Sequence, residues 1–508
     1  MNSQNSITVL VLIAALLLFT GCGPEEHNNN VIPNVFPDKD KTDTSGTSET
    51  VDTSSYVALD PFKVQCKKTV NTASWTTYDA YTVYCIRGFK PTKDPETDIY
   101  GGWKSLNIGN EDGFFRVKKY DGRWWLVDPL GNAFLSKGVA VFSPGSSTRQ
   151  RQNVKDKFGS NQTWANSESR FLREDVGFNS FGAWGSTSEI RNLETRMPYT
   201  VILSPMGNYI SYLKSRGLEK DAFNGAQSWE GYPYDFPMVF DEAFELRVNS
   251  TISAAAGYKN DKYLIGYFID NEIPWKESAL QSCLQKWPST HINHQKAQEW
   301  LDARKGRSGC SYSDANSADK KAFIAYCYEV YCQKLTAALK QYDPNHLFLG
   351  TRFNQWNAEL INEEMFKSAG KYVDVISVNH YQKWQPDQDA MRNWSTWSGK
   401  PFMVTEFYTK GLDSGLGNTT GAGWVVNTQT DRGLFYENFV NELLRSKVCV
   451  GWHWFTYMDN DPTGNADSSN IDSNKGIVQW DCTRYNDLIV RMEEMNNSVF
   501  NLARFYDR

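Results

Sequence analysis

Leu264-Ile265-Gly266-Tyr267-Phe268-Ile269-Asp270-Asn271-Glu272 is an apolar run of β-forming residues that ends on turn residues and a carboxylate. It predicts a short buried strand with Glu272 at its carboxyl end. A second stretch of this kind, residues 401–407, carries Glu406. Either glutamate alone could simply begin a polar loop. Together, at the ends of parallel strands, they form the pair that glycosidic bond hydrolysis requires: a proton donor and a nucleophile or base.

Strand and helix patterns alternate around these two stretches. This alternation predicts an α/β fold, a (β/α)8 TIM barrel over residues 132–508. An open doubly wound sheet is the alternative, but no glycine-rich phosphate loop supports it. The eight expected strands are residues 133–141, 178–184, 199–204, 264–272, 346–350, 373–379, 401–406 and 450–455. The clearest expected helices are residues 164–176, 240–252, 323–339, 435–443 and 485–502.

Residues 59–131 show strand patterns only. Two such patterns, 114–119 and 123–127, flank Tyr120-Asp121-Gly122, which is a strong hairpin signal. A second turn is expected at residues 128–132. The region is small for an independent module, so we expect a β-rich N-terminal extension packed on the barrel.

The first 22 residues have the pattern of a lipoprotein signal peptide. Residues 7–19 are apolar except for Thr8, a length that suits a signal peptide better than a membrane span. Gly21-Cys22 then resembles a bacterial lipobox, although no Lys or Arg precedes the apolar run. Residues 23–58 are polar and predict a flexible tether. We therefore expect a lipid anchor on Cys22, at the outer membrane and exposed at the cell surface or facing the periplasm.

Composition limits the partners and the cofactors. The net charge of −6 gives no basic footprint for nucleic acid. Eighteen Trp and 26 Tyr suit both core packing and stacking on sugar rings. Apart from Cys22, eight cysteines remain, and none has metal-binding spacing, so no metal or cofactor is expected. Three disulfides are conceivable, Cys66–Cys85, Cys283–Cys310 and Cys449–Cys482, with Cys327 and Cys332 as free core thiols.

Several stretches together resemble the clan A glycoside hydrolases, and within that clan family 50, the β-agarases. The resemblance extends from residue 122 to about 505 and departs from the family pattern after residue 379. It rests on residues 122–127, 176–179, 265–272, 350–353, 371–377, 405–407 and 451–455. It implies catalytic glutamates after the fourth and seventh strands and retention of anomeric configuration.

The resemblance implies a role for each catalytic candidate. Glu272 would be the general acid and then the general base, and it must be protonated near neutral pH. Glu406 would be the nucleophile that forms a glycosyl-enzyme intermediate. Asn271 would bind the sugar 2-hydroxyl. Tyr381 or His380 could orient Glu406, although a structural histidine is an equally good interpretation of His380.

Five further residues are candidates for substrate binding. Arg352, just after the fifth expected strand, could hold a carboxylate or a sugar hydroxyl. Asn379 ends the sixth expected strand. Trp184, Trp384 and Trp454 are candidate platforms for a sugar ring.

The preferred function is a retaining glycoside hydrolase acting on a β-linked galactan such as agarose or porphyran. Another clan A activity, a β-galactosidase or β-glucanase, is the near alternative. A non-catalytic glycan-binding lipoprotein is the distant one. Retention of both Glu272 and Glu406 argues against the binder, since binding alone gives no chemical reason to keep the pair.

Cys22→Ala should release the protein from the membrane and leave its activity unchanged. A multiply acylated cysteine holds a protein firmly, whereas the unacylated variant has no anchor. Fractionation of membranes and soluble extract, followed by immunoblotting, measures the distribution. Membrane retention of the variant would refute the lipoprotein interpretation.

Overall fold

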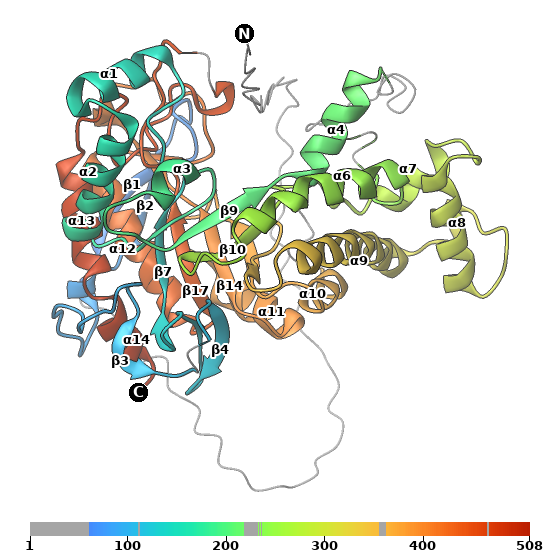
Figure 1. Ribbon diagram of the computed structural model, residues 1–508, viewed down its shortest axis with the longest axis horizontal. Helices are drawn as coiled ribbons and strands as arrows, with labels where there is room; N and C mark the ends of the chain where they lie inside the picture. The colour runs from blue at the N-terminus through green and yellow to red at the C-terminus, as the bar shows by residue number, and fades with distance from the viewer. Residues whose placement is uncertain are drawn as a thin grey trace, which may run out of the picture.

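The computed structural model describes residues 60–109, 112–217, 232, 234, 236–354, 362–464 and 467–508 (Figure 1). The expected signal peptide, its Cys22 and the tether lie outside the described residues. Within the described part, no helix combines the length and the apolar composition needed to cross a membrane.

A parallel sheet of nine strands forms the centre of the molecule. Its order is β11-β10-β9-β8-β7-β17-β14-β13-β12. Along β10, Leu264, Tyr267 and Ile269 pack in the larger core cluster, whereas Ile265 and Phe268 pack with Met403 in the smaller one. The alternation of faces shifts at the irregularity in the β9–β10 register between Leu264 and Gly266. The strands are β7 (Ser136–Val139), β8 (Ser180–Phe181), β9 (Tyr199–Leu203), β10 (Leu264–Ile269), β11 (Leu347–Phe348), β12 (Phe353–Asn354), β13 (Ile376–Asn379), β14 (Phe402–Glu406) and β17 (Cys449–Trp454).

The two ends of this sheet belong to one short segment of chain. β11 pairs with β10, and β12 pairs with β13. Between them, Gly350 has φ +86° and Arg352 has φ +52°, which interrupts the extended conformation. The Leu349 N–H donates to the Tyr267 carbonyl (2.8 Å), and the Asp374 N–H donates to the Phe348 carbonyl (2.8 Å). Residues 347–354 therefore hydrogen-bond to β10 on one side and to β13 on the other. The sheet curls so that both contacts form.

Helices follow most of the strands. Local signals define their ends: Asn316 and Asp319 form a capping box at the start of α9, and Gly399, with φ +67°, ends α11. The helices are α1 (Thr148–Phe158), α2 (Asn161–Glu174), α3 (Thr187–Arg191), α4 (Pro205–Ser215), α6 (Glu242–Ile252), α7 (Ala279–Gln285), α8 (Ile292–Lys305), α9 (Ser317–Tyr342), α10 (Glu363–Gly370), α11 (Gln388–Ser398), α12 (Gln429–Arg445), α13 (Asn486–Asn496) and α14 (Val499–Tyr506).

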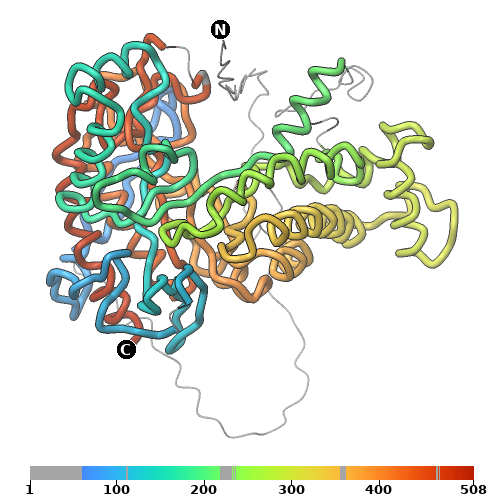
Figure 2. Tube along the Cα trace, viewed as in Figure 1, coloured from blue at the N-terminus to red at the C-terminus, as the bar shows by residue number. Residues whose placement is uncertain are grey.

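The five expected helices all appear, with one difference. The pattern at residues 485–502 predicts one closing helix, but α13 and α14 are separate there. Figure 2 shows a further feature: the yellow part of the chain, with α7 and α8, projects away from the sheet alongside the far end of α9.

The N-terminal region contributes to two antiparallel arrangements. β1 (Phe62–Lys67) and β2 (Thr76–Ala80) join β16 (Trp424–Val426), which pairs with β15 (Thr409–Gly411). The second sheet has the order β3-β6-β5-β4. Its strands are β3 (Trp103–Asn107), β4 (Arg116–Tyr120), β5 (Arg123–Val127) and β6 (Asn132–Phe134). The predicted hairpin is confirmed, since Tyr120 pairs with Arg123 across Asp121 (φ +46°) and Gly122 (φ +79°).

The expected strand 133–141 is wrong as a single element. β6 belongs to the antiparallel sheet, and only β7 enters the parallel sheet. The chain changes sheets at Leu135, inside a continuous buried run. Hydrophobicity alone cannot reveal such a change, because both segments are fully buried.

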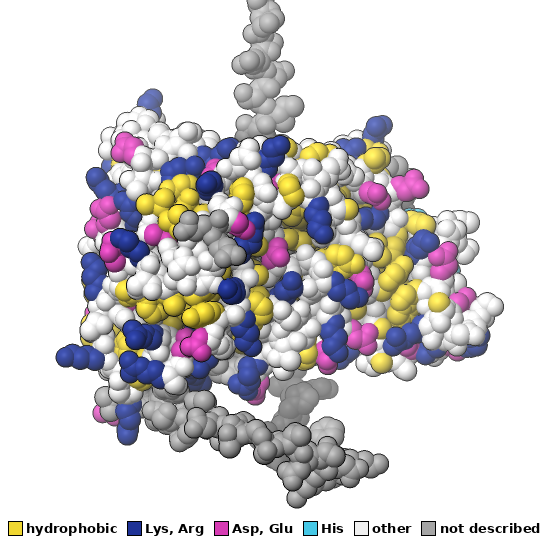
Figure 3. Space-filling model, turned by 60° about the horizontal axis from the view of Figure 1, so that its bottom comes forward, with side chains coloured by type: hydrophobic (Ala, Val, Ile, Leu, Met, Phe, Trp, Pro, Cys, Tyr) yellow, Lys and Arg dark blue, Asp and Glu magenta, His cyan; other side chains and the backbone are white. Residues whose placement is uncertain are grey.

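Buried polar and aromatic contacts attach the N-terminal region to the rest of the molecule. The Arg123 side chain is buried, and it donates to Asp507 (2.9 Å) and to the Leu444 carbonyl (2.8 Å). On β2, Tyr78 packs against Trp384 and Trp424, with both ring centroids at 5.5 Å. On the face seen in Figure 3, basic and acidic side chains are interspersed, without one dominant basic stripe.

The three expected disulfides are wrong. All eight cysteines in the described residues are free and buried. Their thiols have other neighbours: Cys310 contacts the Arg307 carbonyl (3.4 Å), and Cys449 contacts the Gly451 carbonyl (3.2 Å). The spacing of the cysteines along the chain does not predict this result, because a cysteine also serves as a small apolar core residue without forming a disulfide.

Gly138→Ala should destabilise the fold by about 1–3 kcal/mol, the usual range for overpacking a core. A Cβ at Gly138 would lie 2.3 Å from Cδ2 of the buried His453 ring. Chemical denaturation measures the free energy of unfolding. Gly257→Ala is the control, because a Cβ there meets nothing within 4 Å. Equal stability of the two variants would contradict this packing.

Candidate active site

The carboxyl ends of four parallel segments bring the predicted catalytic residues together. Glu272 follows β10, Glu406 ends β14, and Asn379 ends β13. Arg352 lies between β11 and β12. The carboxyl ends of parallel strands are where loops build active sites in α/β folds, so the sheet explains why residues far apart in sequence meet.

A hydrogen-bond network joins the two glutamates through Arg352 and two asparagines. Arg352 donates from Nη2 to Glu406 Oε1 (2.7 Å) and from Nη1 to Asn271 Oδ1 (2.7 Å). Asn379 donates from Nδ2 to Glu272 Oε1 (2.7 Å) and to Asn271 Oδ1 (3.1 Å). Asn271 therefore accepts from both neighbours, and the positions of the two carboxyl groups depend on each other.

Glu406 is held at both of its carboxyl oxygens. Oε1 receives the Arg352 bond, and Oε2 receives the Tyr381 hydroxyl at 2.5 Å. The Glu406 residue is only 6% exposed. These two hydrogen bonds fix the direction of the carboxyl group, which suits a nucleophile with a fixed orientation.

Glu272 lies in a different electrostatic environment. Its Oε1 accepts from Asn379, and its Oε2 accepts from Asn354 Nδ2 at 3.1 Å. Burial, and secondly the negative charge of Glu406, raise the pKa of Glu272 to about 7, although Asn379 and Arg352 act in the opposite direction. A carboxyl group with this pKa carries a proton near neutral pH and can donate it.

Backbone conformations that are unusual for side-chain-bearing residues accompany the site. Glu272 has φ +51°, Arg352 +52° and Trp184 +60°. The Glu272 N–H donates to the Arg352 carbonyl (3.2 Å). Such conformations cost about 1–3 kcal/mol each and persist where surrounding contacts enforce them, often at functional sites.

Aromatic rings fix the Arg352 side chain. Its guanidinium carbon lies 4.1 Å from the Trp184 ring centroid and 5.5 Å from the Phe268 centroid. Its backbone N–H donates to Ser377 Oγ (2.8 Å). Trp184, expected to stack on a sugar, thus contacts Arg352, while its ring remains partly exposed.

His380 does not reach the carboxyl groups with its imidazole. Its backbone N–H donates to the Glu406 carbonyl (2.8 Å), and its ring packs edge-on against Phe439 at 5.0 Å. Burial, and secondly Lys383, lower the pKa of His380 to about 3. Tyr381 is therefore the side chain that orients Glu406, and His380 acts through its backbone.

Trp384 and Trp454 are packed inside the protein. Trp384 donates from Nε1 to the Asp79 carbonyl (2.6 Å) while stacking on Tyr78. Trp454 has no exposure and donates to the Lys475 carbonyl (2.9 Å). Neither ring can present a face to a sugar, which corrects both expectations.

Three residues of the site were not found from the sequence. Asn354 binds Glu272 directly. Thr405 donates from Oγ1 to Asn379 Oδ1 (2.8 Å), which turns the Asn379 amide nitrogen toward Glu272. Ser377 holds the Arg352 backbone. Each is a polar residue at or near a strand end, a signal too common to single them out.

No group of His, Cys, Asp and Glu side chains within the described ranges could hold a metal ion. The chemistry assembled here consists of two carboxyl groups, one guanidinium, one phenol and several amides. This set suits acid–base and nucleophilic catalysis at a glycosidic bond.

Comparisons with known proteins point to the glycoside hydrolases. No protein-family model matches the chain. The chain is 26% identical to Beta-agarase B of Vibrio sp. (strain JT0107) over 495 residues, which cover 80% of this chain and 50% of that protein. Beta-agarase A from the same organism is 26% identical over 508 residues, 81% of this chain and 48% of that protein. The chain thus spans about half the length of these curated relatives.

Solved structures extend the comparison. The crystal structure of BpGH50 has a TM-score of 0.77 and 26% identity, covering 92% of this chain and 99% of that one. An exo-beta-agarase structure has a TM-score of 0.67 at 22% identity, covering 82% and 69%, which is a likeness of fold. The predicted resemblance to the β-agarase-like glycoside hydrolases of family 50 is confirmed.

Glu406→Gln should lower the pKa of Glu272 below about 7, because the variant removes the negative charge beside it. Burial remains, so the value should stay above the ordinary 4.5. Carbon-13 NMR titration of labelled glutamate carboxyl groups measures it, with Glu272→Gln identifying the signal. Glu299→Gln, on exposed α8, is the matched control. An unchanged pKa in Glu406→Gln would contradict the coupling.

Proposed function

We propose that this protein is a retaining glycoside hydrolase that cleaves a β-linked galactan of the agarose or porphyran type. One observation carries the proposal: two glutamates in one network, of which Glu406 is held by Arg352 and Tyr381, and Glu272 has a pKa of about 7. A firmly held carboxyl group beside a second one with a raised pKa suits double displacement. The galactan substrate is supported by the names of the curated relatives.

We infer that the nine-stranded sheet is a closed (β/α)8 barrel. Residues 347–354 hydrogen-bond to β10 on one side and to β13 on the other, and β11 and β12 together make the fifth strand. Counting them as one gives the eight strands that a barrel needs. Closure would bring Glu272, after strand four, and Glu406, on strand seven, to the same mouth.

In the first step, Glu406 attacks the anomeric carbon while Glu272 protonates the leaving oxygen. The carbon–oxygen bond to the leaving sugar breaks, and a glycosyl ester forms on Glu406. Arg352 and Tyr381 orient the attacking carboxylate. Asn271 Oδ1 already accepts hydrogen bonds from Arg352 and Asn379. The amide nitrogen of Asn271 is therefore the atom that donates to the sugar 2-hydroxyl.

In the second step, Glu272 acts as the base. The first step leaves it ionised, and it takes a proton from water, which attacks the anomeric carbon; the bond from that carbon to the Glu406 oxygen breaks, which restores Glu406. Two inversions at the same carbon retain its configuration. This geometry requires the two carboxyl groups about 5–5.5 Å apart.

A β-galactosidase or β-glucanase activity uses the same chemistry and is the alternative function. A lipid anchor on Cys22 remains part of the proposal and would hold the enzyme at the outer membrane. A reducing-sugar assay on agarose, porphyran and plant β-glucans distinguishes these substrates. Lack of hydrolysis on all of them, with retained binding, would favour the glycan-binding lipoprotein.

Removing each glutamate should produce a different defect on an aryl β-glycoside. Glu272→Ala should lower kcat/KM on polysaccharide by about 10²–10⁴-fold, the usual contribution of acid–base catalysis. An activated aryl group needs little protonation, so its release should survive better. Azide needs no base, so it should restore turnover and give the β-glycosyl azide.

Glu406→Ala should instead fail on every substrate, and azide should enter from the opposite face to give the α-azide. Proton NMR of the anomeric signal identifies each product. Wild-type NMR of the first-formed anomer tests retention independently. Azides of the same configuration from both variants, or full polysaccharide activity in Glu272→Ala, would overturn these roles.

A further inference from the structure

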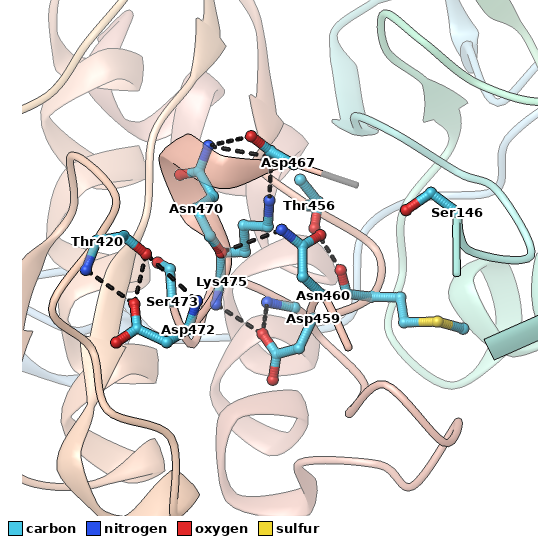
Figure 4. Close-up of polar contacts among 12 residues, drawn as sticks. Ser146, Thr420, Thr456, Asp459, Asn460, Asp467, Asn470, Asp472, Ser473 and Lys475 are labelled. Atoms are coloured by element: carbon cyan, nitrogen blue, oxygen red, sulfur yellow. Dashed lines mark hydrogen bonds and ion pairs between the residues drawn. The ribbon is translucent and has the colours of Figure 1, made fainter. Parts of the chain in front are cut away.

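A second polar group lies in the loop that follows β17. It consists of Lys475, Asp467 and Asn470, which we call the Lys475 cluster. Figure 4 shows Lys475 and Asn470 directed at the Asp467 carboxylate, and Ser146, from the loop after β7, with its hydroxyl facing the group. The mechanism above uses none of these residues.

Lys475 is a buried cation in a fixed position. Its side chain is 3% exposed, and Nζ lies 3.0 Å from Asp467 Oδ2. Its backbone N–H donates to Asp459 Oδ1 (2.7 Å), and its carbonyl accepts from Trp454 Nε1 (2.9 Å). A long side chain held at both its root and its tip loses little further entropy on binding.

Asp467 is the accessible member of the cluster. Its side chain is 34% exposed, and Oδ2 also accepts from Asn470 Nδ2 at 3.1 Å. The cluster therefore presents one ammonium, one amide and one carboxylate side by side, with a net charge of zero. The exposed carboxylate can accept a hydrogen bond from one sugar hydroxyl. The ammonium and amide N–H groups beside it can donate to the oxygen of that hydroxyl or of the next one.

A continuous path of aromatic rings connects this cluster to Glu406. Lys475 Nζ lies 5.2 Å from the Phe455 ring centroid. The Phe455 ring is 5.9 Å from Tyr408, which is 5.5 Å from Tyr381, the residue that binds Glu406. Phe455 also meets Trp184 edge-on at 6.3 Å. Tyr408 thus lies between the cluster and the nucleophile: its hydroxyl donates to Asn470 Oδ1 (3.1 Å), and its ring packs against Tyr381.

The strand order decides which sugar the cluster can meet. β17, whose loop carries the cluster, lies next to β14 in the sheet, whereas Glu272 follows β10, four strands from β17. Glu406 attacks the sugar that becomes covalently bound, and Glu272 protonates the sugar that leaves. The cluster therefore lies on the side of the retained sugar.

We propose that the Lys475 cluster binds ring hydroxyls of the retained sugar and selects a neutral sugar at that position. The inference rests on the proposed function and adds a specificity site to it. The ion pair has no net charge to attract a sulfate ester or a carboxylate, and Asp467 would repel either. Hydroxyl groups satisfy the donors and the carboxylate together.

The competing interpretation is that the ion pair only ties the loop in place. Asp467→Asn distinguishes this interpretation from sugar binding, because the amide keeps the shape of the side chain and an acceptor for Asn470. The test uses the full-length protein carrying Glu272→Gln, so that the oligosaccharide survives the measurement. The probes are an agarose tetrasaccharide and its counterpart bearing a 6-sulfate on the retained sugar.

Isothermal titration calorimetry should give at least tenfold weaker binding of the neutral tetrasaccharide to Glu272→Gln/Asp467→Asn than to Glu272→Gln. The sulfated probe should bind the parent more weakly than the neutral one, and Asp467→Asn should narrow that difference. Thermal unfolding of the same variants measures separately the cost of removing the charged partner of the buried Lys475. Asp389→Asn, an exposed aspartate on α11, is the matched control and should bind like the parent.

Equal affinity of parent and Asp467→Asn for the neutral probe would overturn the proposal, as would a parent that binds neither probe or prefers the sulfated one. The outcome is independent of hydrolysis. If the wild-type protein cleaves no galactan but Asp467→Asn loses binding, the specificity site stands and the hydrolase proposal fails. If cleavage occurs and binding is unaffected, only the specificity site fails.

Discussion

The bond between Arg352 and Glu406 is the interaction on which the rest of the site depends. The guanidinium is buried between Trp184 and Phe268 and uses its two terminal nitrogens on Glu406 and Asn271. A buried charge requires a partner, because removing one member of such a pair leaves the other desolvated. Arg352 therefore ties the orientation of the nucleophile to the residue next to Glu272.

The same network lets two identical side chains behave differently. Glu406 receives hydrogen bonds from a guanidinium and a phenol. Glu272 receives only amides. Burial and the charge of Glu406 raise its pKa to about 7. The raised pKa of Glu272 is thus a property of its surroundings.

The surrounding fold keeps this arrangement rigid. The backbones of Glu272 and Arg352 both have positive φ and are joined by a hydrogen bond, so each unusual conformation supports the other. Tyr381 also packs against Tyr408, whose neighbour Phe455 leads to Lys475. Loops from several strands therefore share one set of contacts around the nucleophile.

Sequence alone determined the alternation of strands and helices, the hairpin at Asp121-Gly122, and the strand ends that carry Glu272 and Glu406. These features are local: hydrophobic period, turn chemistry and a polar residue after an apolar run specify them. Only the tertiary structure decided which strand ends are neighbours. That placement recruited Asn354 and Thr405, buried Trp384 and Trp454, divided the run at Leu135 between two sheets, and left the cysteines unpaired. The reason is physical: burial, hydrogen-bond partners and pKa depend on residues that are close in space but distant in the chain.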